Sequence, residues 1–114
     1  MNPNRLPDYL SHMRQAAEDA CSFVESLSKD DFLADKRTQQ AVIMNLIIIG
    51  EAATKEMDGF AEFSEAHPEG PWRSMRGMRN RIAHGYFELD LDVVWETVQK
   101  ALPALLRQLP TNVH

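Results

Sequence analysis

The sequence predicts an all-α fold, an antiparallel four-helix bundle accompanied by short extra helices. Four long segments place apolar residues at the three- and four-residue steps of an amphipathic helix, and no segment alternates as a strand does. Short connections between these segments place consecutive helices antiparallel. The chain has 114 residues, of which 44% are hydrophobic and 25% are charged. A chain of that length builds one hydrophobic core, so residues 1–114 are predicted to form a single domain.

The first long helix is predicted to run from Leu6 to Leu27. Its apolar residues share one face: Leu6, Tyr9, Leu10, Met13, Ala16, Ala17, Ala20, Phe23, Val24 and Leu27. Cys21 lies on the same face. Because it is the only cysteine, it cannot form an internal disulfide, and a buried, inert thiol is expected.

The second long helix is predicted to begin at Asp35 or Thr38 and to continue to Glu56. Residues 41–50 are apolar nearly all round, apart from Asn45, so this helix is expected to be central or to lie at an interface. Its β-branched isoleucines favour a strand. However, the segment continues for about twenty residues without a turn signal, and that length favours a helix.

The third long helix is predicted from Pro71 to about Ala83. Residues 57–59 end the preceding helix, residues 60–66 form a short acidic helix, and a loop leads to Pro71, which suits a first helical position. The apolar residues of this segment recur at helical spacing: Trp72, Met75, Met78 and Ile82.

The last helix is predicted to begin at a cap formed by Asp90 or Asp92. Its apolar residues alternate steps of four and three, as in the seam of a bundle: Leu91, Trp95, Val98, Leu102, Leu105 and Leu109. Pro103 lacks the amide hydrogen that would bond the carbonyl of Gln99, so it is expected to kink this helix.

The longest apolar run is too short to cross a bilayer, and the N-terminus lacks the basic and apolar regions of a signal peptide. We therefore expect a cytoplasmic protein that does not associate with a membrane. The single Cys21 excludes a cysteine-rich zinc site, and no metal-ligand partners stand at useful spacing around His67. Neither a metal nor another cofactor is expected.

Positive charge is concentrated in the third long helix. Residues 70–87 hold four arginines (73, 76, 79 and 81) and no acidic residue, whereas the whole chain has a formal net charge of −5. A basic patch on an acidic protein suggests a local phosphate site. The ordinary alternative is a solvated helix face with ion pairs to other parts of the protein.

Two charged residues fall on apolar faces of the predicted helices. Arg79 projects between Trp72 and Met75, and Glu51 projects between Met44 and Ile47. Each is costly to bury without a partner, so Arg79 and Glu51 are predicted to form an ion pair. Such a pair is compatible with a structural role and with one that orients Arg79 for function.

The end of the third long helix holds three chemically capable side chains, those of Arg79, His84 and Tyr86. On a straight helix Arg79 and His84 diverge by about 140°. They can meet at one phosphate if the helix opens near Gly85 or if a second copy contributes, so a homodimer is predicted. An imidazole and a guanidinium suffice for RNA cleavage without a metal, because the ribose 2′-hydroxyl supplies the nucleophile. The alternative is that His84 and Tyr86 only pack and cap.

The segment Met78-Arg79-Asn80-Arg81-Ile82-Ala83-His84-Gly85-Tyr86-Phe87 resembles the Arg-x4-His-x-Tyr signature of the HepT family of HEPN-domain ribonuclease toxins. The Ile47-Ile48-Ile49-Gly50-Glu51-Ala52 stretch and the tail from Val94-Trp95 onward are also similar to that family. This likeness covers nearly the whole chain. It implies a dimeric four-helix bundle and a toxin that cuts RNA without a metal. It also implies a neighbouring MntA-type nucleotidyltransferase as the antitoxin, which transfers AMP to Tyr86.

The resemblance also implies roles for single residues. Arg79 binds the scissile phosphate, and His84 transfers a proton. Asn80, one turn before His84, is a supporting residue that orients it or contacts RNA, although ordinary surface polarity explains it as well. Arg73 and Arg76 continue the same face and are candidates for binding the RNA backbone.

Two other classes of function remain open. The bundle could be a non-catalytic subunit that presents this patch to a nucleotidyltransferase and helps it select a substrate, or it could be purely structural. A helical DNA-binding module is disfavoured, because an acidic segment, residues 56–69, precedes the arginine-rich helix.

Overall fold

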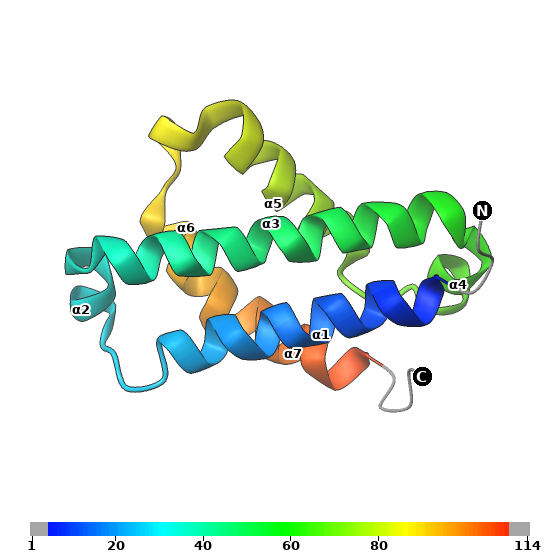
Figure 1. Ribbon diagram of the computed structural model, residues 1–114, viewed down its shortest axis with the longest axis horizontal. Coiled ribbons are helices and arrows are strands. Elements are labelled where there is room, and N and C mark those ends of the chain that lie inside the picture. The colour runs from blue at the N-terminus through cyan, green and yellow to red at the C-terminus, as the bar shows by residue number, and fades with distance from the viewer. Residues whose placement is uncertain (1–4, 110–114) are drawn as a thin grey trace.

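A computed structural model describes residues 5–109, and the regular structure within that range is entirely helical. Helix α1 (Leu6–Phe23) and helix α3 (Lys36–Gly59) lie side by side and run in opposite directions (Figure 1). Helix α5 (Trp72–Gly85) packs on α3, and α7 (Leu102–Gln108) packs on α1. The predicted all-α bundle is confirmed, with α3 as the element that holds α1 and α5 together.

Helix α1 ends four residues earlier than predicted. Val24 leaves helical geometry, with φ −109° and ψ 6°, and the chain turns there, although the Val24 side chain stays buried. Phe23, expected on the apolar face, is 45% exposed. Cys21 is half-buried rather than fully buried, and its Sγ lies 3.9 Å from the carbonyl oxygen of Val98. Burial raises the pKa of this thiol, so it remains protonated and unreactive at neutral pH.

A short helix, α2 (Lys29–Ala34), connects α1 to α3. Ser28 and Asp31 form a reciprocal capping box at its start. Phe32 is completely buried, and its ring lies 5.4 Å from that of Trp95. Asp35 then caps α3 by accepting hydrogen bonds from the amide and the hydroxyl of Thr38, which confirms the predicted start of this helix.

Helix α3 is buried on two sides, as its composition predicts. Its buried apolar residues face α1 and α5: Val42, Ile43, Leu46, Ile49, Ala52 and Ala53. The helix continues to Gly59, the last of the three residues, 57–59, that were predicted to end it. Met44 and Ile48, four residues apart, are 57% and 39% exposed. A strip of α3 therefore presents apolar side chains to solvent.

Helix α4 (Ala61–Ala66) and the loop after it anchor the start of α5. The indole Nε1 of Trp72 donates to the carbonyl oxygen of His67 at 3.0 Å, and the His67 ring stacks on Phe63. Pro71 is the N-cap of α5 rather than its first helical residue, and the helix extends to Gly85 rather than Ala83. The predicted apolar face of α5 is confirmed as buried.

The last helical segment is interrupted before Pro103. Helix α6 (Leu91–Glu96), capped by Asp90, passes into a π-helical stretch, η2 (Thr97–Ala101), and then into α7. The π turn is wider than an α-helical turn and comes just before Pro103, which has no amide hydrogen to donate. The predicted interruption of the helix therefore takes the form of a π-helical stretch.

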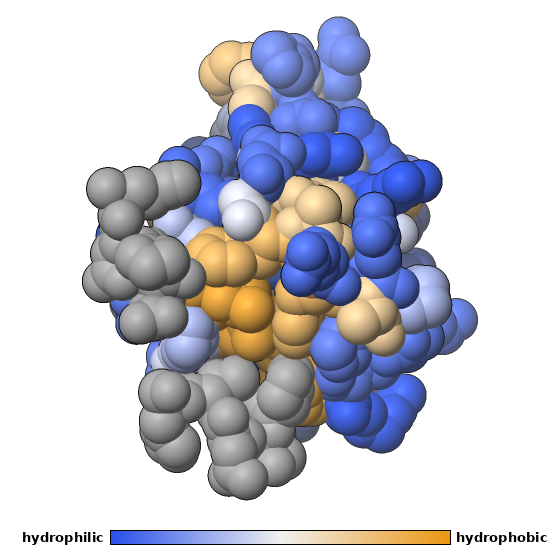
Figure 2. All heavy atoms as spheres, turned by 90° about the vertical axis from the view of Figure 1, so that its right-hand side faces the viewer, coloured by the Kyte–Doolittle hydropathy of each residue, from blue (hydrophilic) through white to orange (hydrophobic). Residues whose placement is uncertain are grey.

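None of the helices in residues 5–109 combines the length and apolarity that a bilayer crossing requires. Viewed from the end where α1 begins, the surface shows an apolar area bordered by hydrophilic side chains (Figure 2).

Candidate functional site

The site is built where α5 crosses α3 in close contact. Gly50 of α3 is buried, and a Cβ atom there would lie 2.3 Å from the Cβ of Arg79 and 2.8 Å from the carbonyl oxygen of Met75. Real Cβ atoms essentially never approach other atoms so closely. The absence of a side chain at Gly50 therefore allows the stem of Arg79 to lie directly on α3.

The Arg79 guanidinium contacts the next turn of α3. Its Nε lies 3.2 Å from Oε1 of Glu51, and its Nη2 donates to Oγ1 of Thr54 at 3.3 Å. The predicted ion pair is confirmed, but the predicted burial of Glu51 is wrong. The Glu51 side chain is 52% exposed, against 25% for Arg79. Helix α5 packs directly over Gly50, so Glu51, the next residue of α3, lies at the edge of the contact between the two helices.

The contact between Arg79 and Glu51 is one of proximity rather than of a directed hydrogen bond. The Nε atom of Arg79 is buried and has no hydrogen-bond acceptor with suitable geometry among residues 5–109. The two charges still attract each other, because this attraction depends on the distance between them more than on the N–H direction. Thr54 consequently supplies the directed hydrogen bond to the guanidinium within the described part of the chain.

His84 and Tyr86 lie where α5 ends. Gly85 adopts φ −151° and ψ 47°, and a 3-10 turn, η1 (Tyr86–Glu88), follows. The predicted opening of the helix at Gly85 is confirmed. This end of α5 and η1 stand out from the other helices (Figure 1). His84 is exposed and has no hydrogen bond or ion pair to any residue in the range 5–109. Tyr86 is 43% exposed, with its ring edge-on to the nearly fully exposed Phe87.

One copy of the chain does not hold His84 against Arg79. Both residues belong to the helical part of α5, so their side chains leave the helix about 140° apart. Arg79 faces α3, whereas His84 faces solvent. The structure therefore places the two groups on different faces of α5.

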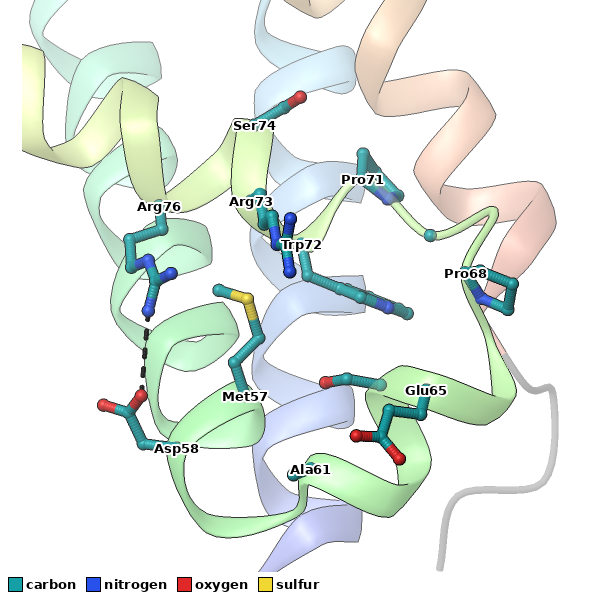
Figure 3. A pocket seen from close by; sticks show the side chains of 12 residues that line it. Met57, Asp58, Ala61, Glu65, Pro68, Pro71, Trp72, Arg73, Ser74 and Arg76 are labelled. Atoms are coloured by element: carbon teal, nitrogen blue, oxygen red, sulfur yellow. Dashed lines mark ion pairs between the residues drawn. The ribbon is translucent and has the colours of Figure 1, made fainter.

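The other predicted residues of the basic face are only partly free. Asn80 and Arg73 are exposed, but Arg76 lies 3.7 Å from Asp58, an ion pair drawn in Figure 3. Arg73 and Arg76 line an open hollow of about 560 Å³ at the ends of α3, α4 and α5, and Asp58 and Glu65 line it too. The acidic residues of α3 and α4 thus offset the charge that the isolated segment 70–87 suggests.

Thr54 is a residue of the site that sequence reasoning missed. It follows Glu51 by three residues, and this i, i+3 spacing was the signal that could have identified it. Without knowledge of how α5 lies on α3, a threonine in a helix is unremarkable. Among residues 5–109, no group of three or more His, Cys, Asp or Glu side chains is arranged as a set of metal ligands.

The fold and the site define the class of protein: an all-α, HEPN-like helical domain with a part-buried arginine and an exposed histidine on its third long helix. The chain belongs to the HepT-like ribonuclease family. A family model described as "Ribonuclease HepT-like" matches residues 13–111.

Curated relatives bear similar names. The chain is 43% identical over 98 residues to "Probable ribonuclease HepT" of Thermococcus cleftensis, with 86% of each chain covered. It is 37% identical over 101 residues to a protein of Caldanaerobacter subterraneus subsp. tengcongensis named "Putative RNase", with 89% of this chain and 88% of the relative covered. No solved structure matches the chain.

Proposed function

We propose that this protein is an endoribonuclease that cleaves RNA by attack of the ribose 2′-hydroxyl on the adjacent phosphate. The observation that carries the proposal is the Arg79 guanidinium, which α3 holds in place while some of its N–H groups have no acceptor in the described part of the chain. It lies on the same helix as His84, which is exposed and has no partner within residues 5–109, in a chain that belongs to a ribonuclease family. Because the nucleophile belongs to the RNA, this reaction needs no metal-activated water.

The two groups take different parts in the reaction. Arg79 binds the non-bridging oxygens of the scissile phosphate and stabilises their growing negative charge. His84 transfers one proton, either from the 2′-hydroxyl or to the departing 5′ oxygen, and water exchanges the other. The products are a 2′,3′-cyclic phosphate and a 5′-hydroxyl. Asn80 supports His84, and Arg73 and Arg76 bind flanking phosphates, Arg76 by exchanging its exposed ion pair with Asp58.

We propose that the active form is a homodimer. Arg79 and His84 of one chain point in different directions, so a complete site requires that a second copy bring the missing group. Exposed apolar side chains are available for the contact: Met44 and Ile48 on α3 and Phe87 on η1. Burying such side chains favours association.

We further propose that the protein is the toxin of a toxin-antitoxin pair and that a MntA-type nucleotidyltransferase silences it through AMP on Tyr86. Tyr86 is 43% exposed at the end of α5, which supports access of an enzyme to its side chain. Attached AMP would place a phosphate anion and a purine beside the basic helix and obstruct RNA. Tyr86→Phe should still cut RNA yet escape silencing; AMP found by intact-protein mass spectrometry on another residue would contradict this.

The cleavage proposal is tested with purified protein, mixed RNA and EDTA. The parent should release cyclic-phosphate ends, and Arg79→Ala and His84→Ala should each lose at least about a hundredfold in rate. Equal cleavage by the parent and both variants would reveal a contaminating nuclease. RNA binding without cleavage by the parent would instead favour the non-catalytic subunit.

A further inference from the structure

One turn of α3 contacts Arg79 in three ways. Gly50 leaves space for its stem, Glu51 lies 3.2 Å from its Nε, and Thr54 accepts a hydrogen bond from its Nη2. The contacts come from residues that face α5 together, since positions four apart on a helix lie on the same side. They restrict where the guanidinium can sit before any ligand arrives.

The Thr54 hydroxyl is itself oriented. It donates to the carbonyl oxygen of Gly50, one turn earlier in α3, at 2.8 Å. A hydroxyl has one hydrogen to donate, so the oxygen of Thr54 can act only as an acceptor toward Arg79. The hydrogen bond from Nη2 therefore ends on an oxygen whose lone pairs are fixed relative to the α3 backbone.

Counting the donors shows what remains for a ligand. A guanidinium has five N–H groups. The Nε atom is buried close to the Glu51 carboxylate and is closed to a ligand, and Thr54 takes one N–H of Nη2. Both contacts lie on the side of the planar guanidinium that carries Nε and Nη2. Among residues 5–109, both N–H groups of Nη1 and the second one of Nη2 have no acceptor, and they can bind two oxygens of one phosphate.

We infer that Thr54 is a positioning residue that holds Arg79 so that the scissile phosphate binds end-on, through Nη1 and Nη2. The inference deepens the proposed ribonuclease function and rests on it. Thr54 does not touch the RNA. Its effect is to keep the guanidinium from rotating about its last side-chain bonds, so that its unused N–H groups stay aimed in one direction.

The chain contains a matched control. Thr97 donates to the carbonyl oxygen of Val93, also four residues earlier, at 2.7 Å, and it is buried. No arginine hydrogen bond to Thr97 occurs within residues 5–109. Valine at either position removes the same bond within the helix. Only at position 54 does it also remove the acceptor for Arg79.

The test compares Thr54→Val, Thr54→Ser and Thr97→Val by steady-state cleavage of one defined RNA and by melting temperature. We expect Thr54→Val to lower kcat about tenfold, the fold-change that corresponds to about 1.4 kcal/mol. Thr54→Ser should remain within about twofold of the parent, because it keeps the hydroxyl. Thr97→Val should have parental kcat. Full activity in Thr54→Val, equal loss in Thr54→Ser, or equal loss in Thr97→Val would each overturn the inference.

A second measurement does not depend on cleavage. In the free protein, the Arg79 Nη2–H resonances should exchange slowly with water in the parent and in Thr54→Ser, and faster in Thr54→Val, because Thr54 accepts the hydrogen bond from Nη2. A parent that shows this pattern but cuts no RNA would refute the proposed function while leaving the positioning of Arg79 by Thr54 intact. Identical exchange in all three proteins would refute the positioning itself.

Discussion

At the scale of single residues, the most constrained position is the glycine beneath Arg79. Gly50 is buried, and the space that its Cβ would need is already taken by Arg79 and by the Met75 carbonyl. A backbone carbonyl cannot move aside as a flexible side chain can. The contact between α3 and α5, and with it the location of the guanidinium, therefore depends on the absence of one methyl group.

Gly50→Ala should lower the free energy of unfolding by about 1–3 kcal/mol, because α5 must shift away from α3. RNA cleavage should fall with it as Arg79 is displaced. Urea unfolding provides the measurement. Gly77→Ala is the control: a Cβ there meets nothing within 4 Å, so the helix should become more stable by up to about 1 kcal/mol. If Gly50→Ala were as stable as the parent, α5 would not lie this close to α3.

Glu51→Ala should have a small effect on stability. A fully buried ion pair would predict a loss of about 3 kcal/mol or more when one partner is removed. Because Glu51 is 52% exposed, solvent screens the pair, and we expect about 1 kcal/mol or less. Thermal melting of Glu51→Ala beside Glu25→Ala, another exposed glutamate, measures the difference. A loss of several kcal/mol would show that the carboxylate is far less solvated than its exposure implies.

At the scale of the helices, α3 also holds a buried carboxyl group away from the Arg79 site. Glu56 is fully buried and accepts a hydrogen bond from the hydroxyl of Ser64 on α4, while its Oε1 has no hydrogen-bond partner within residues 5–109. Burial raises the pKa of Glu56, and the Ser64 hydrogen bond opposes that shift only in part. The junction of α3 and α4 is therefore weakened when this group ionises.

The raised pKa of Glu56 fixes the direction of a pH effect. The folded protein binds this proton more tightly than the unfolded chain, so stability falls as pH rises from the unfolded pKa through the folded pKa. Glu56→Gln should raise the melting temperature at pH 7 more than at pH 4. Glu25→Gln, at an exposed position, serves as the control. A glutamine variant that melts lower than the parent at pH 7 would show that the ionised carboxylate is stabilising.

At the scale of the whole molecule, the separation of Arg79 and His84 makes the assembly testable. Arg79→Ala and His84→Ala chains, each inactive alone, should recover about one quarter of parental activity when co-refolded in equal amounts. Half of the dimers would then be mixed, and each mixed dimer would contain one complete site across the subunit boundary. Light scattering confirms the assembly. No recovery in a mixed dimer would mean that both groups of a site come from one chain.

The sequence by itself determined the features that depend on local order along the chain. Apolar periodicity predicted the four long helical segments, and cap residues such as Asp35 and Asp90 marked helix starts, because these effects act within one or two turns. It also paired Arg79 with Glu51, since two charges on apolar faces each need a partner. The Arg-x4-His-x-Tyr pattern identified the candidate site before its geometry was known.

Only the tertiary structure decided how helices distant in sequence meet. The rotation of α5 about its axis and its distance from α3 determine that Gly50 lies under Arg79, that Thr54 reaches the guanidinium, and that Glu51 stays half-exposed. Helical periodicity describes one helix at a time and carries no information about its neighbour's distance or rotation. Close packing between two helices sets those values, and the hydrogen bonds of Arg79 follow from them.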